Sequence, residues 1–262
     1  MSTRVTGTAF ITGSGSGIGQ KTAYTLAQND ITNLALLDLN TAQLETTRDD
    51  LVASFPNLGI EILTADVKDE TSVEAAVQRI VARFGGIDIA VHAAGIGGQA
   101  PNSDEASFAN WQNVIDINQT GVWLCQRAVV RQMRKQEDRG GRLGRGAIVN
   151  LSSIFGNSIP PTEMGLIPYT TAKHAVVAIT KYAAKAYAAE GIRINAICPN
   201  VVDTPMTHEG IAVGFFDKTI SQTPMGRCGT LEEIADSILY LVSPMSSYVV
   251  GVALVVDGGC TA

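Results

Sequence analysis

A glycine-rich turn between a short apolar run and an amphipathic stretch restricts the fold of this chain more than any other feature. Residues 7–12 predict a strand, a helix is expected from Gln20, and between them lies Thr12-Gly13-Ser14-Gly15-Ser16-Gly17-Ile18-Gly19. Glycine lets the backbone approach a diphosphate closely, and the first turn of the helix offers unpaired N–H groups and a partial positive charge. Strand, turn and helix in this order predict a dinucleotide-binding unit.

The rest of the chain continues this alternation of strands and helices. Strands are expected at residues 7–12, 33–38, 59–64, 87–93, 146–151 and 192–197, and helices between them, for example at 41–54 and 71–84. The expected strands carry few interior charges, which is typical of parallel strands covered on both faces. The pattern predicts a single-domain α/β fold, a Rossmann-like doubly wound parallel β-sheet flanked by helices on both faces.

Composition agrees with one such domain and excludes other classes. The chain has 262 residues, 45% of them hydrophobic, which is enough for a large core. Its formal net charge of −6 argues against nucleic acid or an anionic membrane as a partner. No apolar run approaches the about 20 residues that span a bilayer. Four dispersed cysteines and no visible secretory signal lead us to expect no metal and a cytoplasmic protein.

A long connection at residues 205–229 departs from the alternation. It is too apolar for a disordered loop, with Met206, Phe215 and Phe216 among its side chains. We expect it to form a lid over the substrate site.

The expected strand at 33–38 ends in Asp38, near the glycine-rich turn. A carboxylate at this strand end can accept hydrogen bonds from the adenosine ribose and would repel a 2′-phosphate. Leu39 beside it supplies no compensating cation. The sequence therefore favours NAD(H) over NADP(H), and an ordinary aspartate that caps the next helix is the alternative.

A candidate proton-transfer group follows the expected strand at 146–151. Tyr169 and Lys173 are four residues apart at the start of a long helical stretch, so they share one helix face. A nearby ammonium favours the phenolate and would lower the pKa of Tyr169 from its ordinary value of about 10, which suits a general acid/base. Ser152 and Ser153 follow the strand end, where ligands bind in a doubly wound sheet.

Together these motifs resemble the short-chain dehydrogenase/reductase family. The features that carry the resemblance span nearly the whole chain in the family's order: TGSGSGIG, Asp38, Ala65-Asp66-Val67, Ala93-Ala94-Gly95, Asn118, Ser153, YTTAK and Val256-Asp257-Gly258-Gly259. The chain is similar to the compact members of the family and not to the extended sugar-nucleotide epimerase branch.

The resemblance implies catalytic roles for four residues. Ser153 would polarise the substrate carbonyl or alcohol, Tyr169 would exchange its proton, and Lys173 would hold the nicotinamide ribose and lower the Tyr169 pKa. Asn118 would anchor a water that links Lys173 to solvent. The resemblance also implies a homotetramer, or a dimer, formed through helices around 105–135 and 168–190 and the C-terminal segment.

The resemblance further implies contacts along the cofactor and the substrate. Asp66 would contact the adenine amino group, Val67 would lie beside the ring, and Gly95 would let the cofactor pass over its strand. The expected cofactor-binding residues are Gly13, Ser14, Gly15, Ser16, Gly17, Ile18, Gly19, Asp38, Leu39, Asp66, Val67, Ala94, Gly95, Asn118, Tyr169, Lys173, Pro199, Val202 and Thr204. The expected substrate-binding residues are Ser153, Phe155, Tyr169 and Met206.

The chain departs from the family pattern at three places. The family's Asn-Asn-Ala-Gly begins here with His92, which we expect to be a packed or surface residue and not a proton carrier. The family's Pro-Gly is Pro199-Asn200 here, a turn that asparagine can preserve because it tolerates left-handed backbone. The stretch between Ser153 and Tyr169 is longer than is common, so the choice between Ser152 and Ser153 stays open, and we favour Ser153.

The sequence thus predicts an NAD-dependent oxidoreductase acting on a secondary alcohol or its ketone. The expected cleft side chains are apolar, which favours a small hydrophobic substrate such as a terpenoid, steroid-like or polyketide alcohol, and a place in secondary metabolism. Packing of the lid on the sheet is the other interpretation of these side chains. The alternatives are an NADPH-dependent biosynthetic ketoreductase, a non-catalytic cofactor sensor, and an enzyme of isomerisation or cyclisation.

Overall fold

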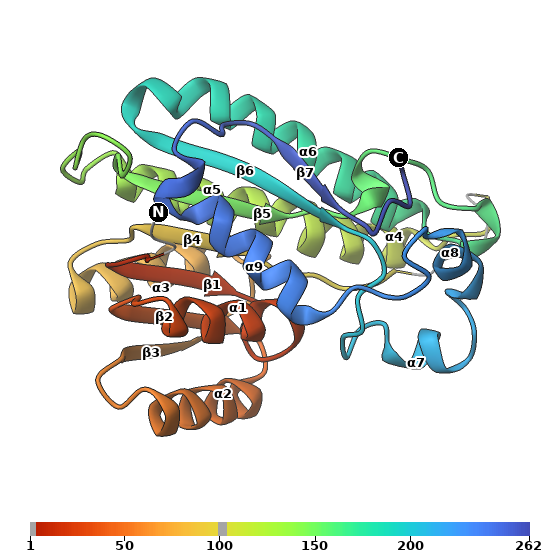
Figure 1. Cartoon of the computed structure of the whole chain (residues 1–262), viewed down its shortest axis with the longest axis horizontal. Helices are drawn as coiled ribbons and strands as arrows, with labels where there is room; N and C mark the ends of the chain where they lie inside the picture. The colour runs from red at the N-terminus through yellow and green to blue at the C-terminus, as the bar shows by residue number, and fades with distance from the viewer. Residues whose placement is uncertain (1–3, 99–103) are drawn as a thin grey trace.

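The computed structural model describes residues 4–98 and 104–262, whose strands form one parallel sheet (Figure 1). Its seven strands lie in the order β3-β2-β1-β4-β5-β6-β7. They are β1 (Thr8–Thr12), β2 (Asn33–Asp38), β3 (Gly59–Thr64), β4 (Ile89–His92), β5 (Gly146–Leu151), β6 (Ile192–Pro199) and β7 (Ala253–Val256). The predicted doubly wound α/β fold is confirmed.

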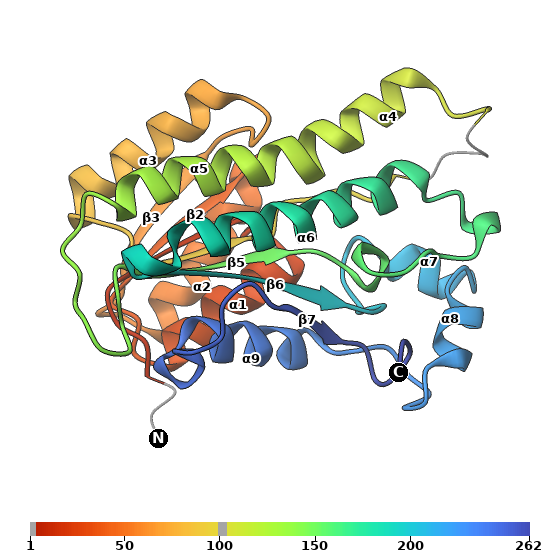
Figure 2. The same ribbon diagram turned by 90° about the horizontal axis from the view of Figure 1, so that it is seen from above.

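Helices cover both faces of the sheet (Figure 2). One face carries α1 (Gly17–Gln28), α2 (Thr41–Ser54) and α9 (Leu231–Val242). The other carries α3 (Glu70–Phe84), α5 (Val122–Met133) and α6 (Ile167–Tyr187). The connection at residues 205–229 contains two short α-helices, α7 (His208–Ala212) and α8 (Asp217–Gln222). The helix α4 (Phe108–Ile115) runs through a π-helical turn into α5. None of the helices in the described ranges has the length and apolar character needed to cross a membrane.

Alternating side chains of each central strand fill two separate cores. In β1, Ala9 and Ile11 face α1 and α9, whereas Phe10 faces the α3 and α5 side, and all three are fully buried. A strand buried on both faces has no polar side, which explains its continuous apolar run. Burying a side chain of the size of Ile11 or Phe10 stabilises the fold by about 1.5–3 kcal/mol.

The expected boundaries agree closely with the structure for most strands, and one strand was not expected. The strands at 33–38, 59–64 and 146–151 match, whereas β4 is shorter than expected and β6 extends to Pro199. The unexpected strand is β7, which has four residues and is partly exposed along its whole length at one edge of the sheet. The lid segment at 205–229 contains two short helices.

His92, on β4, is packed in the core as expected. Its side chain is 1% exposed, and its ring lies edge-on to Phe10 with 6.2 Å between the ring centroids. Neither ring nitrogen has a hydrogen-bond partner among the described residues. Burial penalises the charged imidazolium and lowers the pKa of His92 to about 3.

We expect His92 to make the fold sensitive to acid. Because its pKa in the folded protein lies below its ordinary value of about 6.5, the unfolded chain binds the extra proton first. The free energy of unfolding is therefore at its full value above pH about 6.5. It falls by up to about 1.4 kcal/mol per pH unit as the pH is lowered towards 3. Urea unfolding at pH 7 and pH 5 measures this loss, and His92→Asn should reduce it. An equal loss in both proteins would contradict the assignment.

Candidate functional site

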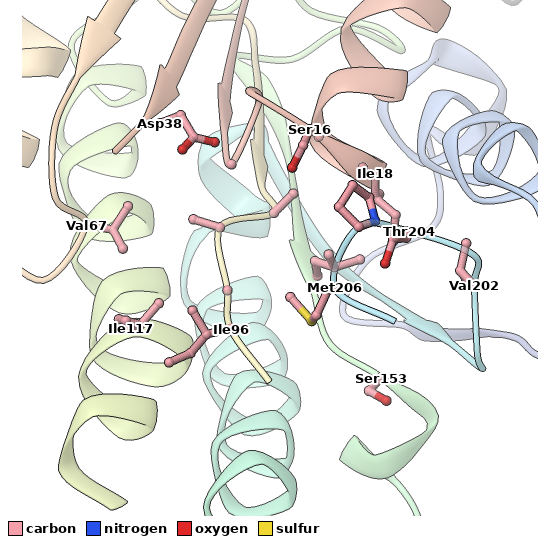
Figure 3. Close-up of a pocket in the computed structure, with 18 of the residues that line it drawn as sticks. Ser16, Ile18, Asp38, Val67, Ile96, Ile117, Ser153, Val202, Thr204 and Met206 are labelled. Carbon is pink, nitrogen blue, oxygen red and sulfur yellow. The ribbon is translucent and has the colours of Figure 1, made fainter. Parts of the chain in front are cut away.

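A cleft of about 330 Å³ opens at the carboxyl edge of the sheet (Figure 3). Its lining comes from the turn after β1, from the ends of β2, β4, β5 and β6, and from residues 204–207. Figure 3 shows Asp38 towards one end of the cleft and Ser153 towards the other, with Val67 on one wall and Met206 across from it. This position is the one in which a doubly wound sheet binds its ligand.

The glycine-rich turn is held in a conformation that side chains would obstruct. Gly13 has φ +68°, and a Cβ there would lie 2.7 Å from the backbone nitrogen of Ala94. At Gly19, a Cβ would lie 2.2 Å from the carbonyl oxygen of Gly13. Ser16 occupies the N-cap of α1 and makes no side-chain capping bond, so the positive end of the helix lies open beside the cleft. This cradle fits the diphosphate of a dinucleotide.

Asp38 joins the end of β2 to the turn after β1. Its carboxylate accepts hydrogen bonds from the N–H of Gly15 and the N–H of Asn40, each at 3.0 Å. The side chain of Asn40 caps α2 by accepting from Gln43 N–H, so Asp38 is not the helix cap. Among the described residues that line the cleft, Lys173 is the basic one, and it lies with Tyr169 and Ser153, not beside Asp38.

Val67 and Ile117 form an apolar wall between the two ends of the cleft (Figure 3). Val67 packs tightly on the π-helical turn Asp116–Gly121, where a Cβ on Gly121 would lie 2.8 Å from Val67 Cγ2. Asp66 beside it accepts from Lys68 N–H at 3.0 Å and also lines the cleft. The face of a flat aromatic ring can pack against such an apolar wall.

The other end of the cleft brings together three predicted catalytic residues. The Ser153 hydroxyl accepts from Phe155 N–H at 3.2 Å, and it lies near enough to the Tyr169 phenol to lower the pKa of that group. Lys173 lies one turn after Tyr169 on α6, with its ammonium 5.5 Å from the ring centroid of Tyr169. Ser152 points elsewhere, because its hydroxyl donates to the carbonyl of Lys173 at 2.9 Å.

The pKa values of this group are set mainly by burial. Burial raises the pKa of Tyr169, and the nearby Ser153 hydroxyl only partly opposes this. Burial also lowers the pKa of Lys173 to about 8, while its ammonium donates to the carbonyl of Leu151 at 2.8 Å. The pKa of Tyr169 thus lies above its ordinary value because the phenolate loses water, and the lowering of this pKa by Lys173 stays a prediction.

Asn118 lies behind the cleft, fully buried within the π-helical turn. Its amide donates to the carbonyl of Ile96 and accepts from Ile96 N–H, both at 2.8 Å. A Cβ on Gly95 would lie 3.1 Å from Asn118 Oδ1, so the segment after β4 passes close to this side chain. The Asn118 side chain thus fixes the floor of the cleft.

Most predicted site residues line the cleft. They are Gly13, Ser16, Gly17, Ile18, Gly19, Asp38, Leu39, Asp66, Val67, Ala94, Gly95, Ser153, Tyr169, Lys173, Pro199, Val202, Thr204 and Met206. Four others lie outside the lining, namely Ser14, Gly15, Asn118 and Phe155. Ser14 is buried with its hydroxyl bonded to Leu37, and Phe155 packs in an apolar cluster with Ile154 and Met164.

The structure adds lining residues that the motifs did not indicate. Gln43 follows Asp38 in the first turn of α2, Ile117 precedes Asn118, and Asn200 follows Pro199. Each of the three lies within five residues of a predicted site residue. This proximity in the sequence is the signal by which they could have been found. The expected left-handed turn at Asn200 is wrong, because Asp30 is the one non-glycine residue of the described part with a positive φ.

Comparison with known proteins agrees with this geometry. Residues 13–261 match the family described as enoyl-(acyl carrier protein) reductase. Short-chain dehydrogenase fogB of Aspergillus ruber is 40% identical to this chain, with 98% of this chain and 97% of that protein covered.

Two further relatives are named as a dehydrogenase and a reductase. Cis-4-hydroxycyclohexanecarboxylate dehydrogenase of Sinomonas cyclohexanicum is 38% identical, with 97% of this chain and 96% of that protein covered. Levodione reductase of Leifsonia aquatica is 34% identical, with 97% of this chain and 93% of that protein covered. A crystal structure of levodione reductase matches with a TM-score of 0.87 at 33% identity, over 99% of this chain and 98% of that one. The chain therefore belongs to the short-chain dehydrogenase/reductase family, whose members are nicotinamide-dependent oxidoreductases.

Proposed function

We propose that this protein exchanges a hydride between NAD(H) and a small hydrophobic secondary alcohol or its ketone. The observation that carries the proposal is the group Ser153, Tyr169 and Lys173, which lines the end of the cleft opposite Asp38. The glycine cradle, the open end of α1 and the apolar wall at Val67 fit a dinucleotide lying between these two ends. When bound, the nicotinamide supplies the hydride donor or acceptor.

The chain's own residues supply binding and proton transfer. Ser153 and Tyr169 line the same end of the cleft, so both hydroxyls can contact one substrate oxygen. Ser153 holds that oxygen, and Tyr169 gives or takes its proton. Lys173 keeps a positive charge near the phenol at neutral pH, which opposes the effect of burial on the phenolate. Asn118 holds the floor of the cleft and, by family resemblance, a water next to Lys173.

The preference for NAD rests on Asp38. Its carboxylate is fixed by two backbone N–H groups at the end of the cleft, where a 2′-phosphate would meet a negative charge. Leu39, 68% exposed, offers no cation to a phosphate.

The preference for a hydrophobic substrate rests on the apolar side chains beyond Ser153. Ile154, Phe155 and Met164 form a buried cluster with Phe215 and Phe216 of the lid. Met206 lines the cleft and is 54% exposed, so an apolar ligand would cover it. The hydroxycyclohexane compound in the name of one relative agrees with a cyclic alcohol or ketone.

We also propose a homotetramer, or a dimer, built on the helices that the family resemblance indicated. Phe108 on α4, Trp123 on α5 and Tyr182 on α6 are large side chains that remain exposed by 76%, 42% and 81%. A second copy of the chain would cover them.

The test of the proposed function is NADH fluorescence with a panel of hydrophobic secondary alcohols, cyclohexanols first, and either NAD⁺ or NADP⁺. We expect turnover with NAD⁺ on one chemical class. Tyr169→Phe should lower the rate on that class roughly 10²- to 10⁴-fold, since it removes the transferable proton, and should leave NADH binding nearly unchanged. A Tyr169→Phe protein that keeps most of its turnover would overturn the role of this residue.

The cofactor preference has its own test. We expect Asp38→Ala combined with Leu39→Arg to move the ratio of NADP⁺ to NAD⁺ affinity in favour of NADP⁺, because a negative charge is replaced by a cation beside the 2′-phosphate. Titration of each protein with NADPH and NADH, followed by fluorescence, measures the ratio. An unchanged ratio would show that ribose recognition lies elsewhere.

A further inference from the structure

Three segments far apart in the sequence meet at Asn200, directly after β6. The side-chain amide donates to Thr223 Oγ1 at 2.9 Å and to the carbonyl of Asp257 at 3.3 Å. The backbone N–H of Asn200 donates to the carbonyl of Val256 at 3.2 Å. Thr223 ends α8 of the lid, and Asp257 follows β7 (Figures 1 and 2). One side chain thus joins the sheet, the end of the lid and the C-terminal turn.

The orientation of the Asn200 amide follows from its partners. Thr223 donates its own hydroxyl proton to the carbonyl of Thr219 at 2.9 Å, so its oxygen can only accept from Asn200. The Asp257 carbonyl is an acceptor as well, and the nitrogen of the amide must therefore face both groups. Asn200 Oδ1 is buried and has no hydrogen-bond partner among the described residues. The polar contribution of this side chain comes from its two N–H groups.

The C-terminal turn is rigid and packs closely on the end of the lid. The Asp257 carboxylate accepts from the N–H groups of Gly259 and Thr261 at 2.9 and 2.8 Å. Gly258 has φ +63°, and a Cβ there would lie 2.8 Å from Thr223 Cγ2. Met225 N–H donates to the carbonyl of Gly258 at 3.2 Å. The turn therefore gives Asn200 and Thr223 a fixed surface.

The other side-chain attachments of the lid are local or exposed. At its start, Thr207 bonds to Val202 and Thr204. In its middle, Lys218 pairs with Glu163 at 2.9 Å, but the two side chains are 62% and 64% exposed, and an ion pair this exposed contributes little to stability. Near its end the backbone adds two bonds, from Met225 N–H to Gly258 and from Gly229 N–H to Val201. The part-buried amide of Asn200 is thus the side-chain contact that joins the end of α8 to β6 and to the C-terminal turn.

We propose that Asn200 is a positioning residue that fixes the end of the lid, and with it the apolar wall of the substrate cleft. The inference rests on the proposed function only in taking residues 205–229 as that wall. Loss of the two N–H donors removes the side-chain link from the end of α8 to β6 and to the C-terminal turn. The wall of the cleft then becomes looser and substrate binding weaker, while the proton-transfer residues on β5 and α6 stay in place.

Hydrogen exchange of the protein alone, read by mass spectrometry, tests this directly. In Asn200→Ala we expect amides at 211–223 and 257–261 to exchange about ten-fold faster or more, as for the loss of two hydrogen bonds, with amides of β1 and β5 unchanged. Asn200→Asp keeps the size of the side chain without its donors and should behave like Asn200→Ala. Ser221→Ala is the matched control, because it removes a hydrogen bond that stays within α8.

Two exchange results would overturn the proposal. In the first, amides at 211–223 and 257–261 exchange at the same rate in both Asn200 variants as in the unchanged protein. In the second, the amides of the central strands exchange faster by the same factor as those of the lid. Neither result depends on turnover, so a failure of the proposed redox function leaves this test intact. With the alcohol that gives the fastest turnover, Asn200→Ala should raise KM by a larger factor than it lowers kcat. A fall in kcat with KM unchanged would contradict a positioning role in the lid.

Discussion

The close approach of β1 and β4 at their carboxyl ends is the contact on which the site depends. The chain reverses its direction of travel across the sheet between these two strands, and a cleft opens wherever a doubly wound sheet does so. Thr12 Oγ1 accepts from Ala94 N–H at 3.2 Å, and Gly13 leaves no room for a side chain against Ala94. This contact lets the glycine-rich turn, Asp38 and the segment after β4 line one continuous cleft.

The second constraint is the burial of the group for which we propose proton transfer, Ser153, Tyr169 and Lys173. Lys173 is 3% exposed, and its ammonium donates a hydrogen bond to the carbonyl of Leu151. This bond fixes β5 and α6 relative to each other. The Ser152 hydroxyl donates to the Lys173 carbonyl and so stabilises the same junction. Ser153 is then the serine near Tyr169. Burial raises the pKa of Tyr169 and lowers that of Lys173, so each group favours its neutral form more than it would in water.

Much of the fold and of the site could be predicted from the sequence. The apolar runs predicted the central strands because both faces of these strands are buried, and the six-residue edge strand β3 was predicted as well. The other edge strand, Ala253–Val256, has four residues that are all partly exposed, so its run is too short to stand out. Local motifs indicated most of the residues that line the cleft. The direction of the Tyr169 pKa could not be predicted, because it depends on burial by distant segments. The role of Asn200 was equally hidden, since its partners Thr223 and Asp257 are remote in sequence.

The most direct test of the central claim is transfer of deuterium. NADH carrying deuterium at C4 of the nicotinamide, in the position that is transferred, is incubated with a cyclic ketone whose alcohol is a substrate. Mass spectrometry then locates the label in the product. Our account predicts one deuterium on the carbinol carbon of the alcohol, because the cleft holds nicotinamide and substrate side by side. Product that forms without deuterium would show a reaction other than hydride transfer and would contradict the account.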